Sequence, residues 1–192
     1  RAGKCAIDQA LHKRIWYDIH RQTRQPAALC SNDAKSCYDR IIHSIAILAY
    51  KRIGVPAPSV ECMFQTIQNM RHHIRTSYGD SIFYLDSTGV LIPFQGVLQG
   101  NGAAPATWVL ISTPLLNMLR NAGNGSYLRC SISRMMQHIV AFAFVDDTDL
   151  ITSDVGNWTI TEDIIMQRMQ QSINRWEGGL KVTGGAIVPE KS

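Results

Sequence analysis

I-V-A-F-A-F-V-D-D-T-D-L-I-T, residues 139–152, is the stretch that most limits the architectures open to this chain. Apolar residues 139–145 lead into adjacent Asp146 and Asp147, and a second strand-like run follows at 148–152. This pattern predicts a β-hairpin with both carboxylates near its tip. Adjacent carboxylates repel each other, and a hard divalent cation with oxygen ligands stabilises such a pair. The alternative is that Asp serves here only as a favoured turn residue.

A third carboxylate follows another short apolar stretch. Pro26 ends a preceding helix, and residues 27–32 (A-A-L-C-S-N) predict a buried strand that delivers Asp33 at its carboxyl end. This is a position where ligand sites often lie. The alternative is that Asp33, or Asp39, caps the helix expected over residues 38–53.

Periodic apolar residues predict further helices. Residues 6–22 carry an apolar side chain at every fourth position, which predicts an amphipathic helix with a basic outer face; these positions are Ile7, Leu11, Ile15 and Ile19. Helices are also expected over 60–74, 105–120 and 161–176. The second of these is apolar on nearly every side and should be largely buried, and Gly178-Gly179 should stop the third.

One more hairpin completes the expected elements. Residues 81–85 and 90–94 flank D-S-T-G at 86–89, which has hairpin chemistry. Helices and hairpins are intermixed, and no regular β-α-β alternation is present. The expected fold class is therefore α+β, with a small antiparallel sheet backed by helices.

Composition supports a globular protein that needs no cross-links. The 192 residues are 45% hydrophobic and 18% charged, with a net charge of +4. Five scattered cysteines without a C-x-x-C pair predict neither a disulfide framework nor a zinc site, and they favour a reducing compartment. No apolar run is long enough to span a bilayer, so we expect no membrane partner and an intracellular location, nuclear or cytoplasmic.

Two segments are candidate ligand contacts. Gln95-Gly96 and Gln99-Gly100 precede the helix at 105, where backbone amides could approach a ligand closely; the alternative is an ordinary turn. Residues 71–75 hold a basic cluster that could contact nucleic-acid phosphates, made of Arg71, His72, His73 and Arg75. The alternative is a solvated helix end. Adjacent histidines do not share a helix face, so zinc is not expected.

Four of these segments, taken in order, resemble the palm of reverse transcriptases. Residues 32–39 (N-D-A-K-S-C-Y-D) look like the family's first catalytic motif, and residues 97–105 (V-L-Q-G-N-G-A-A-P) look like its Gln-Gly-x-x-x-x-Pro motif. Residues 144–147 look like the aromatic-x-Asp-Asp signature, and residues 179–192 resemble the Gly and Lys landmarks of the next motif. Residues 1–15 resemble the segment before the first motif in non-LTR retrotransposon and group II intron enzymes, the closest pattern.

Two departures from the pattern leave the carboxylates untouched. Ala104 stands where the family usually has Ser, and Phe144 replaces the commoner Tyr.

The resemblance implies an RNA-directed DNA polymerase that uses an RNA template, a DNA primer and dNTPs. Asp33, Asp146 and Asp147 would be its catalytic residues and, with the backbone carbonyl of Ala34, would hold two Mg²⁺ ions, which Mn²⁺ could replace. The implied nucleotide-binding residues are Tyr38, as a steric gate against ribose, together with Gln99, Gly100 and Lys191.

The resemblance also implies that residues 1–192 form one reverse transcriptase domain fragment, the palm with part of the fingers. The N-terminal fingers and the C-terminal thumb would be absent, so the fragment alone could be inactive. Two other functions stay open: an RNA-dependent RNA polymerase, which Tyr38 disfavours, and a domesticated, non-catalytic nucleic-acid-binding domain, which the three intact aspartates disfavour. Protein partners are unknown.

Overall fold

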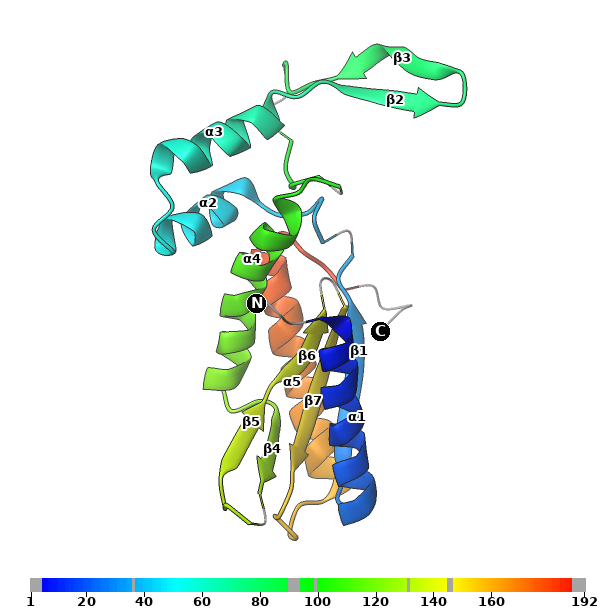
Figure 1. Ribbon diagram of the computed structural model, residues 1–192, viewed down its shortest axis with the longest axis vertical. Coiled ribbons are helices and arrows are strands. Elements are labelled where there is room, and N and C mark those ends of the chain that lie inside the picture. The colour runs from blue at the N-terminus through cyan, green and yellow to red at the C-terminus, as the bar shows by residue number, and fades with distance from the viewer. Residues whose placement is uncertain are drawn as a thin grey trace. The chain divides into compact units, whose positions relative to one another are not determined.

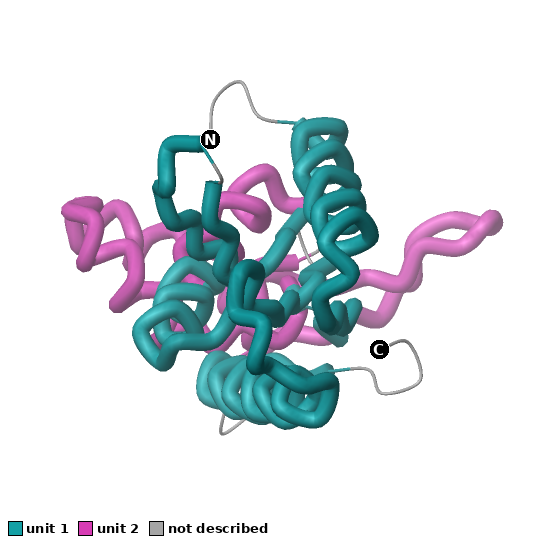
Figure 2. Tube along the Cα trace, turned by 90° about the horizontal axis from the view of Figure 1, so that it is seen from below, with its two compact units in different colours: residues 1–37, 112–192 teal, residues 38–111 magenta. Residues whose placement is uncertain are grey.

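The structure is a computed structural model that describes residues 5–35, 37–89, 94–98, 100–130, 132–144 and 147–187. Its residues divide into two compact units, one made of 1–37 with 112–192 and the other of 38–111 (Figure 2). Within the described residues, no helix is long and apolar enough to cross a lipid bilayer.

The first unit is built on a five-stranded sheet organised around one long strand. Its strands are β1 (Ala27–Asp33), β4 (Ser126–Arg129), β5 (Met136–Ile139), β6 (Ala141–Phe144) and β7 (Asp147–Asp154). On one edge β7 pairs with the whole of β1, from Asp147 to Ser153, and on its other edge it pairs with β6 first and β4 afterwards. The β4–β7 pairing is parallel, so the sheet is mixed, while its other pairings are antiparallel as expected. β7 extends beyond the residues that pair with β6, and β4 pairs with the part of this edge that β6 leaves free.

Helices cover both faces of this sheet (Figure 1). α1 (Ala6–Thr23) packs over β6, and the core beneath it contains Trp16, Phe142 and Ile151. Side chains alternate along a strand, so Leu150 points to the opposite face, where α5 (Glu162–Val182) packs against β1 and β7. The predicted α+β class is confirmed.

α1 occupies its predicted range but buries a different face. Ile7, Leu11 and Ile15 are 76%, 55% and 47% exposed, whereas Trp16 and His20 are buried. The Trp16 ring fills the core, and its Nε1 donates a hydrogen bond to Ser126 Oγ at 2.9 Å. Burial of the Trp16 ring and its hydrogen bond therefore determines which face of α1 points to the sheet, and the aliphatic stripe does not.

α5 runs past its predicted end. Thr161 caps the helix by accepting a hydrogen bond from the backbone of Ile164, but the helix continues through Gly178-Gly179 to Val182. A Cβ on Gly179 would lie 3.0 Å from Leu115 Cδ2 and 3.1 Å from Met118 Cε. Gly179 therefore permits close packing of two helices and does not stop one.

The helix that contacts Gly179 is α4 (Ala104–Asn121), which matches its predicted bounds to within one residue. The expectation that it is buried on nearly every side is wrong, because Val109 is 59% and Met118 37% exposed. Its buried side consists of Ala104, Thr107, Trp108, Ile111, Leu115 and Leu119. β4 and β5, which follow it, were not predicted: four-residue strands carry too little periodicity.

The second unit contains α2 (His43–Arg52), α3 (Ala57–Gln68) and a hairpin of β2 (His72–Thr76) with β3 (Gly79–Leu85). The helix expected over 60–74 ends at Gln68, because residues 72–76 pair with β3 across a turn in which Gly79 has a φ of +118°. The expected strand over 81–85 is confirmed, but its partner is β2. Residues 90–93 of the predicted partner strand lie outside the described part of the chain.

Candidate functional site

The register of β1 and β7 places two of the predicted catalytic carboxylates directly opposite each other. Asp33, the last residue of β1, is the Cα partner of Asp147, the first residue of β7. Directly opposite residues have Cβ atoms about 4.5–5.5 Å apart and share one face of the sheet, and like charges so placed are destabilising. Asp33 is half-buried and Asp147 is exposed. Such a pair suits a cation bound by oxygen ligands.

Asp33 has no capping role. α2 begins only at His43, its N-cap is Ile42, and no side chain caps it. The capping alternative for Asp33 and for Asp39 is therefore wrong. Beyond Asp33 the backbone is held by a second segment, because buried Ala34 bridges to Ile187 and Lys35 N donates to Ala186 O at 2.9 Å.

Three predicted site residues lie outside the described residues: Asp146, Gln99 and Lys191. The described residues contain no group of three or more His, Cys, Asp or Glu side chains arranged to hold a metal. Among the predicted ligands, the structure therefore brings together Asp33 and Asp147.

A fourth carboxylate lies one row further along the same face. Asp149 is two residues from Asp147 on β7, and Lys13 Nζ of α1 contacts its Oδ2 at 2.5 Å. The two side chains are 16% and 32% exposed. Lys13 thus neutralises the charge of Asp149, the next acidic residue on this face of β7. Sequence reasoning missed this pair because it depends on how α1 lies across the sheet.

In the second unit, the Gln-Gly segment is bound to the backbone that follows the first motif. Gly96 N donates to Ile41 O and Val97 N donates to Tyr38 O, both at 2.8 Å. Gly96 has a φ of +88°, and a Cβ there would lie 2.6 Å from Asp39 O, so this approach requires glycine. The carbonyls of Tyr38 and Ile41 bond to this segment, which explains why the helix expected from residue 38 begins at His43.

His43 fastens the same loop from the start of α2. Its backbone N donates to Gln95 Oε1 at 2.8 Å, and its Nε2 lies 2.5 Å from Gly96 O. Gln68 Nε2 lies 2.9 Å from His43 Nδ1. An amide N–H donates, so Nδ1 accepts and Nε2–H donates, which defines a neutral imidazole. Burial lowers the pKa of His43, and the bond to the Gly96 carbonyl opposes that shift.

Two predicted nucleotide-binding residues, Tyr38 and Gly100, belong to this part of the second unit. The hydrogen bond from Val97 N to Tyr38 O connects half-buried Tyr38 to the segment that contains exposed Gly100. Gly100 has a φ of +93°, and no atom lies within 4 Å of where its Cβ would be. Leu98 has a φ of +63°, which is unusual for a bulky residue. Backbone strain of this kind clusters at functional sites.

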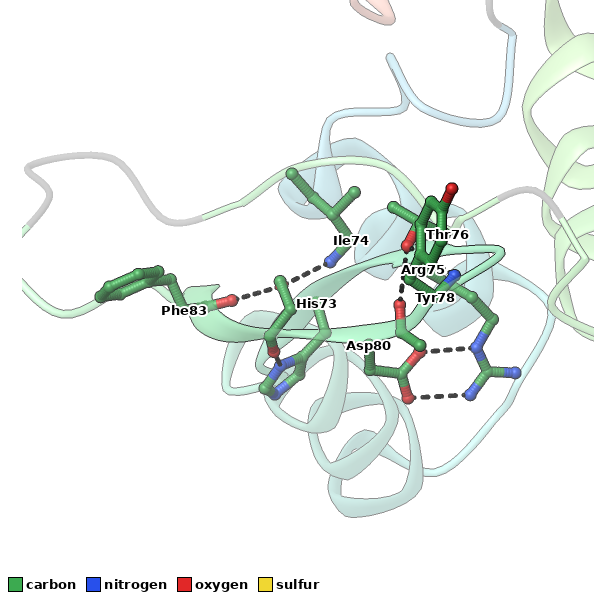
Figure 3. A network of polar contacts seen from close by, with 9 residues as sticks. His73, Ile74, Arg75, Thr76, Tyr78, Asp80 and Phe83 are labelled. Atoms are coloured by element: carbon green, nitrogen blue, oxygen red, sulfur yellow. Dashed lines mark hydrogen bonds and ion pairs between the residues drawn. The ribbon is translucent and has the colours of Figure 1, made fainter.

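Three residues of the basic cluster, His72, His73 and Arg75, lie on β2 of the β2–β3 hairpin, and Arg71 directly precedes β2 (Figure 3). The preceding helix already ends at Gln68, so the alternative of a solvated helix end is wrong. Arg75 forms a fork with both carboxylate oxygens of Asp80, at 2.7 and 2.9 Å, and lowers the pKa of Asp80. The Arg71 guanidinium stacks over the Tyr84 ring at 4.5 Å. Tyr78 at the turn is fully exposed. The hairpin presents cationic and aromatic side chains together.

Comparison with family models and with curated proteins finds no match. Solved structures of telomerase are similar. A Candida albicans telomerase in complex with the TWJ fragment of telomeric RNA aligns with 97% of this chain at a TM-score of 0.60 and 12% identity. Two Candida tropicalis telomerases, an apo form truncated from its C-terminal domain and a form with that RNA fragment, align with 98% and 95% at TM-scores of 0.53, with 16% and 14% identity.

This chain spans about a third of those telomerase chains, the covered shares being 30%, 34% and 28%. At these identities the likeness concerns the fold. The chain has a reverse transcriptase-like fold.

Proposed function

We propose that this chain is the core of an RNA-directed DNA polymerase of a retroelement, which extends a DNA primer on an RNA template. One observation carries the proposal: Asp33 and Asp147, far apart in sequence, lie opposite each other at the adjoining ends of β1 and β7. Two carboxylates placed directly opposite each other repel, and a bound divalent cation offsets that repulsion. The reverse transcriptase-like fold provides the setting in which such a pair has a use.

The residues present fit divalent metal ions. Asp33 and Asp147 supply hard oxygen donors on one face, and Asp146 and the Ala34 carbonyl would complete the ligand set. When bound, two Mg²⁺ ions, or Mn²⁺, activate the primer 3′-hydroxyl and stabilise charge on the leaving pyrophosphate. The chain's own part is to hold these oxygens at fixed strand ends.

Nucleotide and nucleic-acid contacts follow from the same proposal. Tyr38 would exclude a ribose 2′-hydroxyl, while Gln99 and Gly100 would line the nucleotide pocket. Gly100 suits a place in the nucleotide pocket because it is exposed and no atom lies within 4 Å of where its Cβ would be. Lys191 would neutralise pyrophosphate, and Arg71 and Arg75 of the hairpin would contact template phosphates.

The test is primer extension on an RNA template with dNTPs and Mg²⁺, using the chain within its full-length protein. We expect Asp33→Asn and Asp147→Asn each to reduce extension by at least about 10²-fold, because each removes charge that stabilises the transition state. Asp163→Asn is the matched control: it makes the same chemical change at an exposed residue in the first turn of α5. A thermal melt of each variant separates lost chemistry from lost folding.

Two results would favour the other functions. Incorporation of ribonucleotides in preference to deoxynucleotides would indicate an RNA-dependent RNA polymerase and would remove the gating role of Tyr38. Metal-independent RNA binding by a folded full-length protein, with no extension and no effect of Asp33→Asn, would indicate a non-catalytic binding domain.

A further inference from the structure

A polar hollow lies in the first unit, remote from the aspartate pair. It has a volume of about 480 Å³ and lies between α5, the end of β7 and the β4–β5 hairpin. Six polar residues line it: Asn124, Tyr127, Asp154, Arg168, Gln171 and Arg175. Asp154 and Asp147 are at opposite ends of β7, about 23 Å apart at 3.3 Å per residue, and strand alternation directs them to opposite faces.

Two arginines of one helix stripe meet in this hollow. Arg168, Gln171 and Arg175 are spaced i, i+3 and i+7 along α5, so they lie on one side of the helix. Each guanidinium is oriented by a neighbour: Arg175 Nη1 donates to Asn124 Oδ1 at 2.6 Å, and Arg168 Nη1 lies 3.4 Å from Asp154 Oδ2. A guanidinium has five N–H donors, so these contacts leave both arginines with donors to spare.

The charge and lining of the hollow favour an anion. Two guanidinium groups face one carboxylate, and the other three polar lining residues, Asn124, Tyr127 and Gln171, are uncharged. Pockets for uncharged small molecules are lined mostly by apolar side chains, whereas polar groups make up most of this one. Arginine pairs recognise phosphate through parallel N–H···O bonds.

We propose that this hollow binds a phosphate group, carried either by a nucleic-acid backbone or by a free nucleotide or phosphate. Arg168 and Arg175 hold the phosphate oxygens, with Gln171 between them as a further donor. Asp154 orients Arg168 and also limits affinity, because its carboxylate repels the ligand. The site is independent of the proposed catalytic metals.

The test is titration of the chain in EDTA with inorganic phosphate and separately with the oligothymidylate (dT)12, followed by amide NMR shifts. We expect phosphate to shift the amides of Asn124 and Gln171. Arg175→Gln and Arg168→Gln should each weaken binding about tenfold, as expected for a charged hydrogen bond. Asp154→Asn should strengthen it about threefold, the effect of removing one partly screened like charge. Arg14→Gln and Glu177→Gln are charge-matched controls outside the hollow.

The two sources of phosphate give different outcomes. Tighter binding of (dT)12 than of phosphate, with competition between them, identifies a nucleic-acid backbone; phosphate binding with no gain for (dT)12 identifies a free ligand. Absence of shifts at the hollow in a folded chain, or equal weakening by Arg14→Gln, would overturn the proposal. EDTA removes the catalytic metals, so failure here leaves the polymerase proposal standing, and failure of primer extension leaves this one standing.

Discussion

Replacing Lys13 with Met should destabilise the protein by about 1–2 kcal/mol. The variant keeps most of the aliphatic stem but removes the ammonium that lies 2.5 Å from Asp149 Oδ2. Asp149 is only 16% exposed, so its charge would be left partly desolvated and without its lysine. The loss should lie between the 0–1 kcal/mol of a surface pair and the 3–5 kcal/mol of a broken buried one.

Repulsion along the strand adds to this loss. Asp149 and Asp147 are two residues apart on one face, about 7 Å, where two negative charges repel by about 0.6 kcal/mol in water and about 2.4 kcal/mol at an effective dielectric of 20. Lys13 offsets part of this repulsion in the native protein. Asp149→Asn should therefore suppress the effect of Lys13→Met.

A double-mutant cycle measured by urea unfolding checks this reasoning. Lys13→Met, Asp149→Asn and the double variant should give a coupling of about 1 kcal/mol or more. The Arg14–Asp18 pair is the matched control, since its side chains are 69% and 44% exposed, and its coupling should be about 0.3–0.5 kcal/mol. Equal couplings for the two pairs would refute the claim that burial by α1 makes the Lys13–Asp149 pair matter.

Gly96→Ala should lower the free energy of unfolding by about 3 kcal/mol. Gly54 has nearly the same φ, +87°, but no atom lies within 4 Å of where its Cβ would be, so Gly54→Ala should lower it by only about 1 kcal/mol. Similar urea midpoints for the two variants would contradict a clash at Gly96. Gly178→Ala should raise the melting temperature by removing a helix glycine, whereas Gly179→Ala should raise it less, because Leu115 Cδ2 and Met118 Cε must move aside. An equal rise in both would contradict close packing at Gly179. Because the folded pKa of His43 is lowered, the unfolded state binds more protons, so stability should be full above pH 6.5 and fall below it. Urea unfolding at pH 7.5 and 5.5 tests this, and an equal pH dependence in His43→Gln would remove His43 as a cause.

Much of the candidate site could be predicted from sequence because its carboxylates follow continuous apolar runs. The strand before Asp33 and the strand that begins at Asp147 both lie where they were expected. What local patterns could not provide is the register between them, which depends on pairing across most of the chain. That Asp33 and Asp147 lie opposite each other therefore follows from the folded structure and not from local sequence.

Two of the wrong predictions, the buried face of α1 and the helix over 60–74, share a physical cause. Apolar spacing placed Ile7, Leu11 and Ile15 on the buried side of α1, but the Trp16 ring and its buried hydrogen bond outweighed them. Ile74 continued a helical pattern, yet the turn at Gly79 allowed its segment to pair as a strand. In both cases a tertiary or turn interaction overrode a local periodicity.

The shared strand β7 has a consequence for how the protein forms. β1 is synthesised well before its pairing partner β7, and β6 and β4 also pair with β7. Closing so long a loop costs conformational entropy before any ladder bond repays it, so the sheet should assemble late and slowly. Asp33 and Asp147 come to lie opposite each other only when β7 pairs with β1, so a nascent chain would not carry their charge repulsion until synthesis had passed β7.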